Sequence, residues 1–168
     1  MKNQTLKTVM FARLAVLVFC SLFISNLSFA CDTTVNTGLT SSGDEIVMSS
    51  DETVCITSSG SIIVDDHDDG GLIQLPASTS NLTITNDGTL QTGQYDGVGS
   101  EAEENNTITA TGAATNVTIT NSGVIAASGR HAINLKNAEG DITVTNNAGA
   151  IMTCVSDNQN GCVNLSGA

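Results

Sequence analysis

Apolar and polar residues alternate strictly in four similar segments of this chain. The segments begin at Thr53, Asn81, Asn116 and Asp141, and the clearest of them reads NVTITNSGVI. In each segment the second and fourth residues are apolar, and threonine lies between or after them. The apolar residues are Val54 and Ile56, Leu82 and Ile84, Val117 and Ile119, and Ile142 and Val144. A period of two with β-branched residues on both faces predicts a β-strand, not a helix.

Each segment continues into a predicted corner. Two places further on, the inward position becomes polar, at Ser58, Asn86, Asn121 and Asn146. A glycine follows, at Gly60, Gly88, Gly123 and Gly149, and then an apolar residue begins a second strand. Glycine suits a sharp corner because it permits backbone angles that other residues resist. Since buried amides need hydrogen-bond partners, we expect Asn86, Asn121 and Asn146 to bond to one another as a ladder.

A further short strand is predicted in each unit, at residues 72–75, 107–110, 132–135 and 162–165. The distance from the preceding strand to this strand varies between units. The distance to the next unit does not, because the first three of these strands each end six positions before the next segment begins. A connection of constant length to the next unit, together with a connection of variable length within each unit, is typical of a coil with one fixed corner and one corner that carries loops. We therefore predict an all-β fold, a right-handed parallel β-helix of about five coils over residues 31–168. An antiparallel sandwich is the alternative, although it does not require like residues at equivalent places in successive strands.

The N-terminal residues have the pattern of an export signal. A basic head with Lys2, Lys7 and Arg13 precedes the apolar segment Leu14–Ala30, which ends in Ser-Phe-Ala before Cys31. This pattern predicts a signal peptide over residues 1–30 that is cleaved after export. A transmembrane anchor is the competing interpretation. An acylated Cys31, as in a small periplasmic lipoprotein, is another.

Four cysteines remain after the predicted cleavage: Cys31, Cys55, Cys154 and Cys162. An even number of cysteines in an exported chain indicates disulfides, and proximity favours Cys31–Cys55 and Cys154–Cys162 among the three possible pairings. Buried free thiols are the alternative, and a metal site is favoured less because neither a CxxC motif nor a nearby histidine pair is present.

The charge of the predicted mature chain excludes one class of partner. All seventeen acidic residues lie after residue 30, with only Arg130 and Lys136 against them, so its formal net charge is 2 − 17 = −15. Such a chain lacks the array of cations that binds phosphates, so we expect no nucleic-acid partner.

Taken together, the signal-like N-terminus, the coils of the form NxTITNxGxI, the scarcity of aromatic residues and the acidity resemble the passenger region of a bacterial autotransporter (type V secretion). The resemblance implies a β-helical stalk or adhesin that is exported to the cell surface or secreted, and whose partner is an unknown surface component or glycan. It also implies a C-terminal outer-membrane translocator barrel. No barrel-like strands follow Cys162, so we expect a truncated gene or the N-terminal piece of a larger protein.

Two acidic segments are candidates for binding. The segment DDHDDGG contains Asp65, Asp66, Asp68 and Asp69, which could hold Ca²⁺ weakly, or could form an ordinary solvated loop. No other cofactor is expected. Tyr95 begins a long excursion, residues 95–106, and could stack on a sugar or enter a partner's pocket; a disordered insertion is the alternative.

Candidate catalytic chemistry is sparse. Arg130 and His131 could bind an anion, or could form ordinary surface. The acidic residues fix no acid–base pair of the kind that polysaccharide hydrolysis needs, and no GxSxG motif is present. We therefore expect a protein that is not an enzyme, with an exported carbohydrate-active enzyme on the same scaffold as the alternative. A carboxylate pair aligned on adjacent coils would favour the enzyme, and a smooth Thr/Asn face would favour the stalk.

Overall fold

The computed structural model describes residues 30–40, 45–64, 71–93, 106–127, 131–154 and 161–167. The chain divides into two compact units with the boundary after Ala30, the position at which the sequence predicts cleavage. Cys31–Ala168 is therefore described by itself. Its described residues form strands and turns, and no helix.

Five coils of three strands each follow one another along the chain. Coil 1 contains β1 (Thr33–Val35), β2 (Gly38–Leu39) and β3 (Ile46–Val47); coil 2 contains β4 (Thr53–Ile56), β5 (Ser61–Val64) and β6 (Ile73–Leu75). Coil 3 contains β7 (Ser80–Asn86), β8 (Thr89–Thr92) and β9 (Ile108–Ala110); coil 4 contains β10 (Thr115–Asn121), β11 (Val124–Ala127) and β12 (Ile133–Asn134). Coil 5 contains β13 (Glu139–Asn146), β14 (Ile151–Cys154) and β15 (Val163–Asn164).

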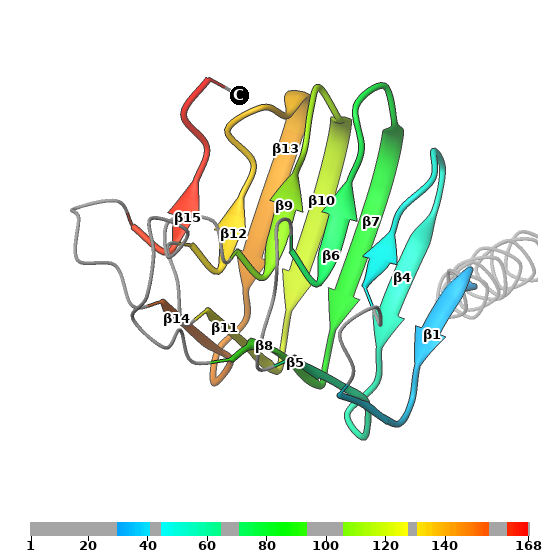
Figure 1. Cartoon of the computed structure of the whole chain (residues 1–168), viewed down its shortest axis with the longest axis vertical. Helices are drawn as coiled ribbons and strands as arrows, with labels where there is room; N and C mark the ends of the chain where they lie inside the picture. Colours follow the sequence, from blue (N-terminus) through cyan, green and yellow to red (C-terminus); the bar gives the residue numbers. More distant parts are fainter. Residues whose placement is uncertain are drawn as a thin grey trace, which may run out of the picture. The chain divides into compact units, whose positions relative to one another are not determined.

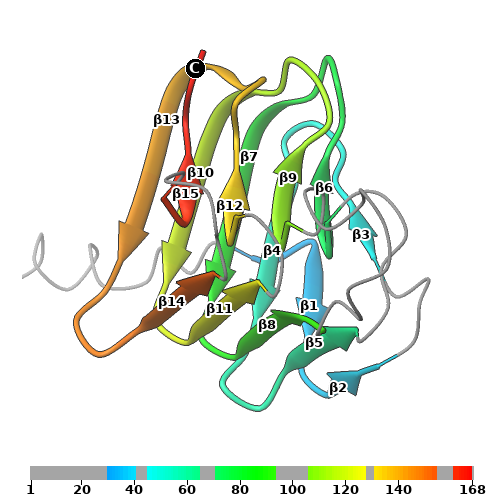
Figure 2. The ribbon, with the colours of Figure 1, turned by 60° about the vertical axis from the view of Figure 1, so that its left-hand side comes forward.

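Equivalent strands of successive coils pair in three parallel sheets (Figures 1 and 2). Sheet A has the order β1-β4-β7-β10-β13, sheet B the order β2-β5-β8-β11-β14, and sheet C the order β3-β6-β9-β12-β15. Every pairing is with the next or previous coil, and all are parallel. The prediction of a parallel β-helix of about five coils is confirmed, and an antiparallel sandwich is excluded.

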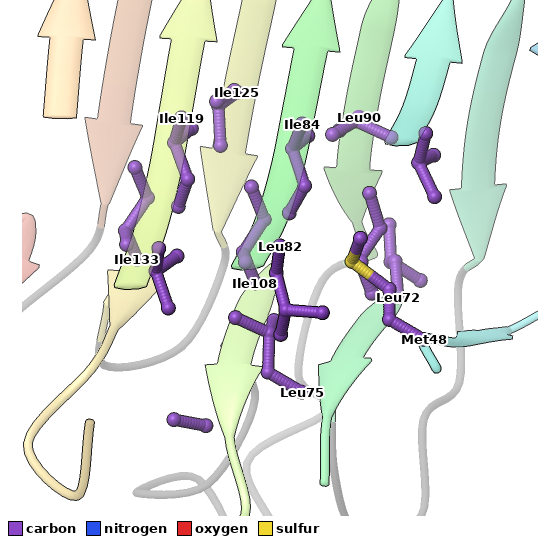
Figure 3. Packing of buried hydrophobic residues seen from close by; sticks show 14 of the residues in the cluster. Met48, Leu72, Leu75, Leu82, Ile84, Leu90, Ile108, Ile119, Ile125 and Ile133 are labelled. Atoms are coloured by element: carbon purple, nitrogen blue, oxygen red, sulfur yellow. The ribbon is translucent and has the colours of Figure 1, made fainter. Parts of the chain in front are cut away.

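The core lies between the three sheets, and its residues stack like over like. Ile119 pairs with Ile84 on one side and with Val144 on the other, so one aliphatic side chain covers the next. The strongly buried residues come from all three sheets, as Figure 3 shows for Leu82, Ile108 and Ile125. Burying an aliphatic side chain of this size contributes about 1.5–3 kcal/mol, so the stacked column is the main source of stability.

The register of coil 2 differs from the predicted alignment. Thr53 pairs with Thr83, not with Asn81, so Ile56 lies beside Asn86 and takes the place of a ladder residue. Ser58, which the sequence placed inward, is exposed. The coils come back into step at Ser61, which pairs with Thr89, because the turn before it is two residues longer than its counterpart. The two-residue shift keeps the same face of the strand inward, so Val54 and Ile56 remain buried, and the longer turn that absorbs the shift costs little.

The three corners of the coil differ in length. Two or four residues join sheet A to sheet B in coils 2 to 5, and a short turn returns from sheet C to the next strand of sheet A, as the constant spacing predicted. The connections from sheet B to sheet C are longer and vary between coils. The ends of all five therefore lie at one corner, which we name the B–C corner. The segments 41–44, 65–70, 94–105, 128–130 and 155–160 belong to these connections and lie outside the described residues.

Candidate functional site

The asparagines at the corner between sheets A and B form a continuous ladder. Asn86 Nδ2 donates to Asn121 Oδ1 at 2.7 Å, and Asn121 Nδ2 donates to Asn146 Oδ1 at 2.7 Å. Each amide also binds the turn, since Asn86 Nδ2 donates to the Val124 carbonyl and Asn86 Oδ1 accepts from the Gly88 N–H. Asn86 and Asn121 are fully buried, so these two amides hold the corner and are not accessible to a ligand, whereas Asn146 at the end of the ladder is exposed.

A second ladder, which the sequence analysis missed, lies at the start of sheet A. Asn116 Nδ2 donates to Asn81 Oδ1 at 3.1 Å, and Asn81 Nδ2 donates to Asp51 Oδ1 at 2.7 Å. All three residues have positive φ, between 56° and 63°, and Gly140 continues the series at 75°. Asn and Asp tolerate this left-handed conformation better than most residues. That preference is the sequence signal by which the positions could have been found.

Both predicted disulfides are present. Cys31 and Cys55 are joined with a Cα–Cα distance of 5.8 Å, and Cys154 and Cys162 with a distance of 5.3 Å. The first ties the start of coil 1 to coil 2. The second joins the end of β14 to the start of β15, so it closes the B–C corner of coil 5.

His131 is not the ordinary surface residue that the sequence offered as one interpretation. It is 1% exposed, and its Nδ1 lies 2.9 Å from the Gly161 carbonyl oxygen, to which it donates. It therefore joins coil 4 to the residue before Cys162. Nε2 is buried and has no hydrogen-bond partner among the described residues. Arg130, its predicted companion, lies outside them.

The other predicted binding residues also fall outside the described part of the chain. These are Asp65, Asp66, Asp68 and Asp69, the weak Ca²⁺ candidates, and Tyr95, the candidate binding residue. Within the described ranges, no group of three or more His, Cys, Asp or Glu residues is placed to hold a metal ion.

The carboxylates near the start of sheet A bind the protein itself. Asp32 Oδ2 accepts from the Thr53 N–H at 2.8 Å, and Glu52 accepts from the Thr33 hydroxyl and the Ser49 N–H. Asp51 accepts from Asn81 as described above. These carboxylates therefore cap backbone and side-chain donors of coils 1 to 3.

The outer face of sheet A carries a regular array of threonines. One column runs through Thr83, Thr118 and Thr143, and a second runs two residues further along the strands. We name these six residues, at the centre of β7, β10 and β13, the threonine array: Thr83, Thr85, Thr118, Thr120, Thr143 and Thr145. Thr53 extends the first column into coil 2, where Cys55 interrupts the second.

The hydroxyls of the threonine array make no hydrogen bond with any other described residue. In contrast, the hydroxyls of Thr57 and Thr107 donate to backbone carbonyls at 3.3 Å and 2.8 Å. All six residues of the array are exposed or half-buried. The array is thus a face of free hydroxyl and methyl groups, without a charged residue among them.

Comparison with known proteins found no matching family model, no similar curated protein and no similar solved structure. No helix among the described residues is long and apolar enough to cross a membrane.

Proposed function

We propose that this chain is an exported β-helical passenger-type protein that acts at the cell surface, or after secretion, as a stalk or adhesin. The observation that carries the proposal is the smooth threonine face of sheet A, which lies on a scaffold of stacked three-strand coils. Such a scaffold extends by adding coils and keeps its cross-section, as a stalk requires. The partner would be a surface component or a glycan.

The two disulfides support the export step. Disulfides persist in oxidising compartments and are rare where thiols are kept reduced. Both ends of the described solenoid carry one, between coils 1 and 2 and within coil 5. Together with the signal-like residues 1–30, this supports passage through the periplasm.

The alternative, a carbohydrate-active enzyme, finds less support. Hydrolysis needs two carboxyl groups that face one substrate across a fixed gap. Among the described residues, Asp32, Asp51 and Glu52 lie near the start of sheet A, and each accepts hydrogen bonds from the protein's own groups. They are therefore committed to the fold.

Export is tested by locating the chain in a Gram-negative host that expresses it in full. We expect the protein in the periplasm or at the surface, with the mass of a chain that starts at an unmodified Cys31. Its four cysteines should not react with alkylating reagents until the disulfides are reduced. The matched control is Leu17→Arg, which places a charge in the apolar centre of the predicted signal. Reduced, cytoplasmic wild-type protein would overturn the proposal. A mass increased by acyl chains would identify the lipoprotein alternative.

The adhesive role is tested on cells that display the chain. Protease treatment of intact cells should remove it, and adherence to immobilised glycans and matrix proteins should exceed that of cells expressing Leu17→Arg. Protease-accessible protein without added adherence would identify a stalk. Chain that is protected in intact cells would contradict both roles.

A further inference from the structure

We infer that the threonine array is a binding face for ice, that is, for a crystalline lattice of water. This inference does not depend on the proposed surface role, because it concerns the folded solenoid alone. It begins from the contrast between the three sheets.

Strand propensity alone does not explain the array. Threonine is favoured on the outer face of any strand. If propensity were the cause, sheets B and C would show the same columns. Instead, single threonines stand among other residue types. One outward column of sheet B reads Ser61, Thr89, Val124 and Ile151, the other reads Ile63, Gln91, Ala126 and Thr153, and the column of sheet C reads Val47, Gln74, Thr109, Asn134 and Asn164. Threonine at two outward positions of three successive coils is found in sheet A and not in the described strands of sheets B and C.

The array has a fixed two-dimensional repeat. Neighbouring strands of a sheet are about 4.8 Å apart, and residues two places apart along a strand are separated by about 6.6 Å. Threonine has a stiff χ1 because it is branched at Cβ, so its hydroxyl and methyl groups hold their positions. The two asparagine ladders flank the array on both sides and fix the strands in register. Figure 1 shows β7, β10 and β13 side by side and parallel.

A rigid repeat in two dimensions matches a ligand that also repeats in two dimensions. The free hydroxyls each donate one hydrogen bond and accept two, as water molecules in a lattice require of a neighbour. The methyl groups between them lie against the apolar spaces of that lattice. An ordered layer of water on this face would therefore continue into ice at little entropic cost, because the protein has already ordered its partner groups.

Other crystalline ligands fit the face less well. An ionic mineral would need charged groups, and the array has none. A crystalline polysaccharide would be expected to stack its sugar rings on aromatic side chains, and the described part of sheet A contains no aromatic residue. The chemistry of the face, neutral hydroxyl and methyl in alternation, favours frozen water.

The experiment measures uptake into growing ice. The full chain is produced with export, so that both disulfides form, and is fused to a fluorescent protein. Ice is grown slowly on a cold surface in a stirred solution, and the ratio of fluorescence in ice to that in liquid is compared with the ratio for the fluorescent protein alone. We expect enrichment of the fusion in the ice and exclusion of the unfused protein. Equal exclusion of both would overturn the inference.

Substitutions locate the binding face. Thr118→Tyr places a bulky ring at the centre of the array, on an exposed residue, and should reduce the ice-to-liquid ratio to that of the unfused protein. The matched control is Thr153→Tyr, which makes the same change at an exposed outward position of sheet B and should retain the wild-type ratio. Retention by Thr118→Tyr, or equal loss in both variants, would overturn the assignment to sheet A.

Two milder variants protect the test against misfolding. Thr118→Val keeps the shape and removes the hydroxyl, and Thr118→Ser keeps the hydroxyl and removes the methyl. Both should melt with the wild type in circular dichroism and yet lower the ice-to-liquid ratio. Wild-type uptake by both variants would contradict a lattice made of hydroxyl and methyl groups. Capture of the wild type on crystalline cellulose or chitin, without uptake into ice, would also overturn the inference and identify a polysaccharide ligand.

Discussion

Coils 4 and 5 contain nearly the same strand and bury it very differently. In coil 4, Val117 and Ile119 are fully buried, because coil 3 covers them on one side and coil 5 on the other. In coil 5, Ile142 and Val144 are only half-buried, because β13 pairs with β10 and with no other described strand. The same sequence motif therefore has a different energetic weight in the two coils. In a solenoid the interfaces between neighbours supply most of the stability.

Substitution of the core should show the largest difference between the two coils. Ile119→Asp buries an unpaired carboxylate between two coils, and we expect a loss of more than about 4 kcal/mol, enough to unfold the stack. Val144→Asp should cost much less, because its carboxylate can reach water. Thermal unfolding by circular dichroism measures both, with Ile119→Val as a conservative control at about 1 kcal/mol. Equal melting of Ile119→Asp and the wild type would show that Ile119 does not face the core.

Substitution of the glycines in the turn between sheets A and B should show the next largest difference in stability between coils 4 and 5. A Cβ at Gly123 would lie 2.1 Å from the Gly88 carbonyl oxygen of coil 3, whereas nothing lies within 4 Å of a Cβ at Gly149 in coil 5. We expect Gly123→Ala to cost about 3 kcal/mol through overpacking. Gly149→Ala should cost about 1 kcal/mol, because φ is +88° there and only backbone strain remains.

Urea denaturation of the two glycine variants is the measurement. A Gly123→Ala variant as stable as Gly149→Ala would mean that the turns of coils 3 and 4 are further apart than described.

Substitution in the asparagine ladder should show a smaller difference in stability, again with the larger loss in coil 4. Asn121→Ala removes the acceptor of Asn86, the donor to Asn146 and the bond to the Gly123 N–H, so we expect a loss of about 2 kcal/mol. Asn146→Ala should cost under about 1 kcal/mol, because Asn146 is exposed and water replaces its partners.

Hydrogen exchange of the backbone amides at residues 122–124 reports the ladder locally. Faster exchange there in Asn121→Ala, with little change in Asn146→Ala, is the expected result. The reverse order would show that the ladder does not hold the turn.

Substitutions on the outer face of sheet A should change stability almost equally little in coils 4 and 5. Thr118→Ala and Thr143→Ala each remove an exposed hydroxyl that bonds to no described residue, so both changes should stay within about 0.5 kcal/mol of the wild type. Chemical denaturation of the two variants measures this difference. A loss above 1 kcal/mol in either variant would mean that the array contributes to folding and is not a free surface.

Much of this architecture could be predicted because it is encoded in local repetition. The alternation around Ile84 and Ile119, with Gly88 and Gly123 at a constant offset, specifies strands, corners and their inward residues. The prediction failed at Ser58, where an extra pair of turn residues shifts the first segment by two places. An alignment of sequence segments cannot recognise such a shift, because moving a strand by two residues keeps the same face inward.

The predictions of binding residues depended on the variable connections and remain untested. Asp65 and Tyr95 lie in B–C connections, which differ in length and sequence from coil to coil. Repetition therefore says nothing about where their side chains lie. The position of His131 was also not predictable from repetition. A polar histidine next to Arg130 suggested ordinary surface, whereas the fold buries His131 in the interior.

The sequence by itself determined that the chain forms short strands and that they return to a common start, and it favoured the pairing of four cysteines with their nearest neighbours that the structure confirms. These features follow from periodicity and spacing, which act over a few residues. Only the tertiary structure decided the register of coil 2, the left-handed ladder through Asp51, Asn81 and Asn116, and the interior position of His131. It also revealed that threonines of β7, β10 and β13 share one face and bind nothing within the described fold. The physical reason is that each of these features depends on which residue of a neighbouring coil lies alongside, and the stacking of the coils sets that contact.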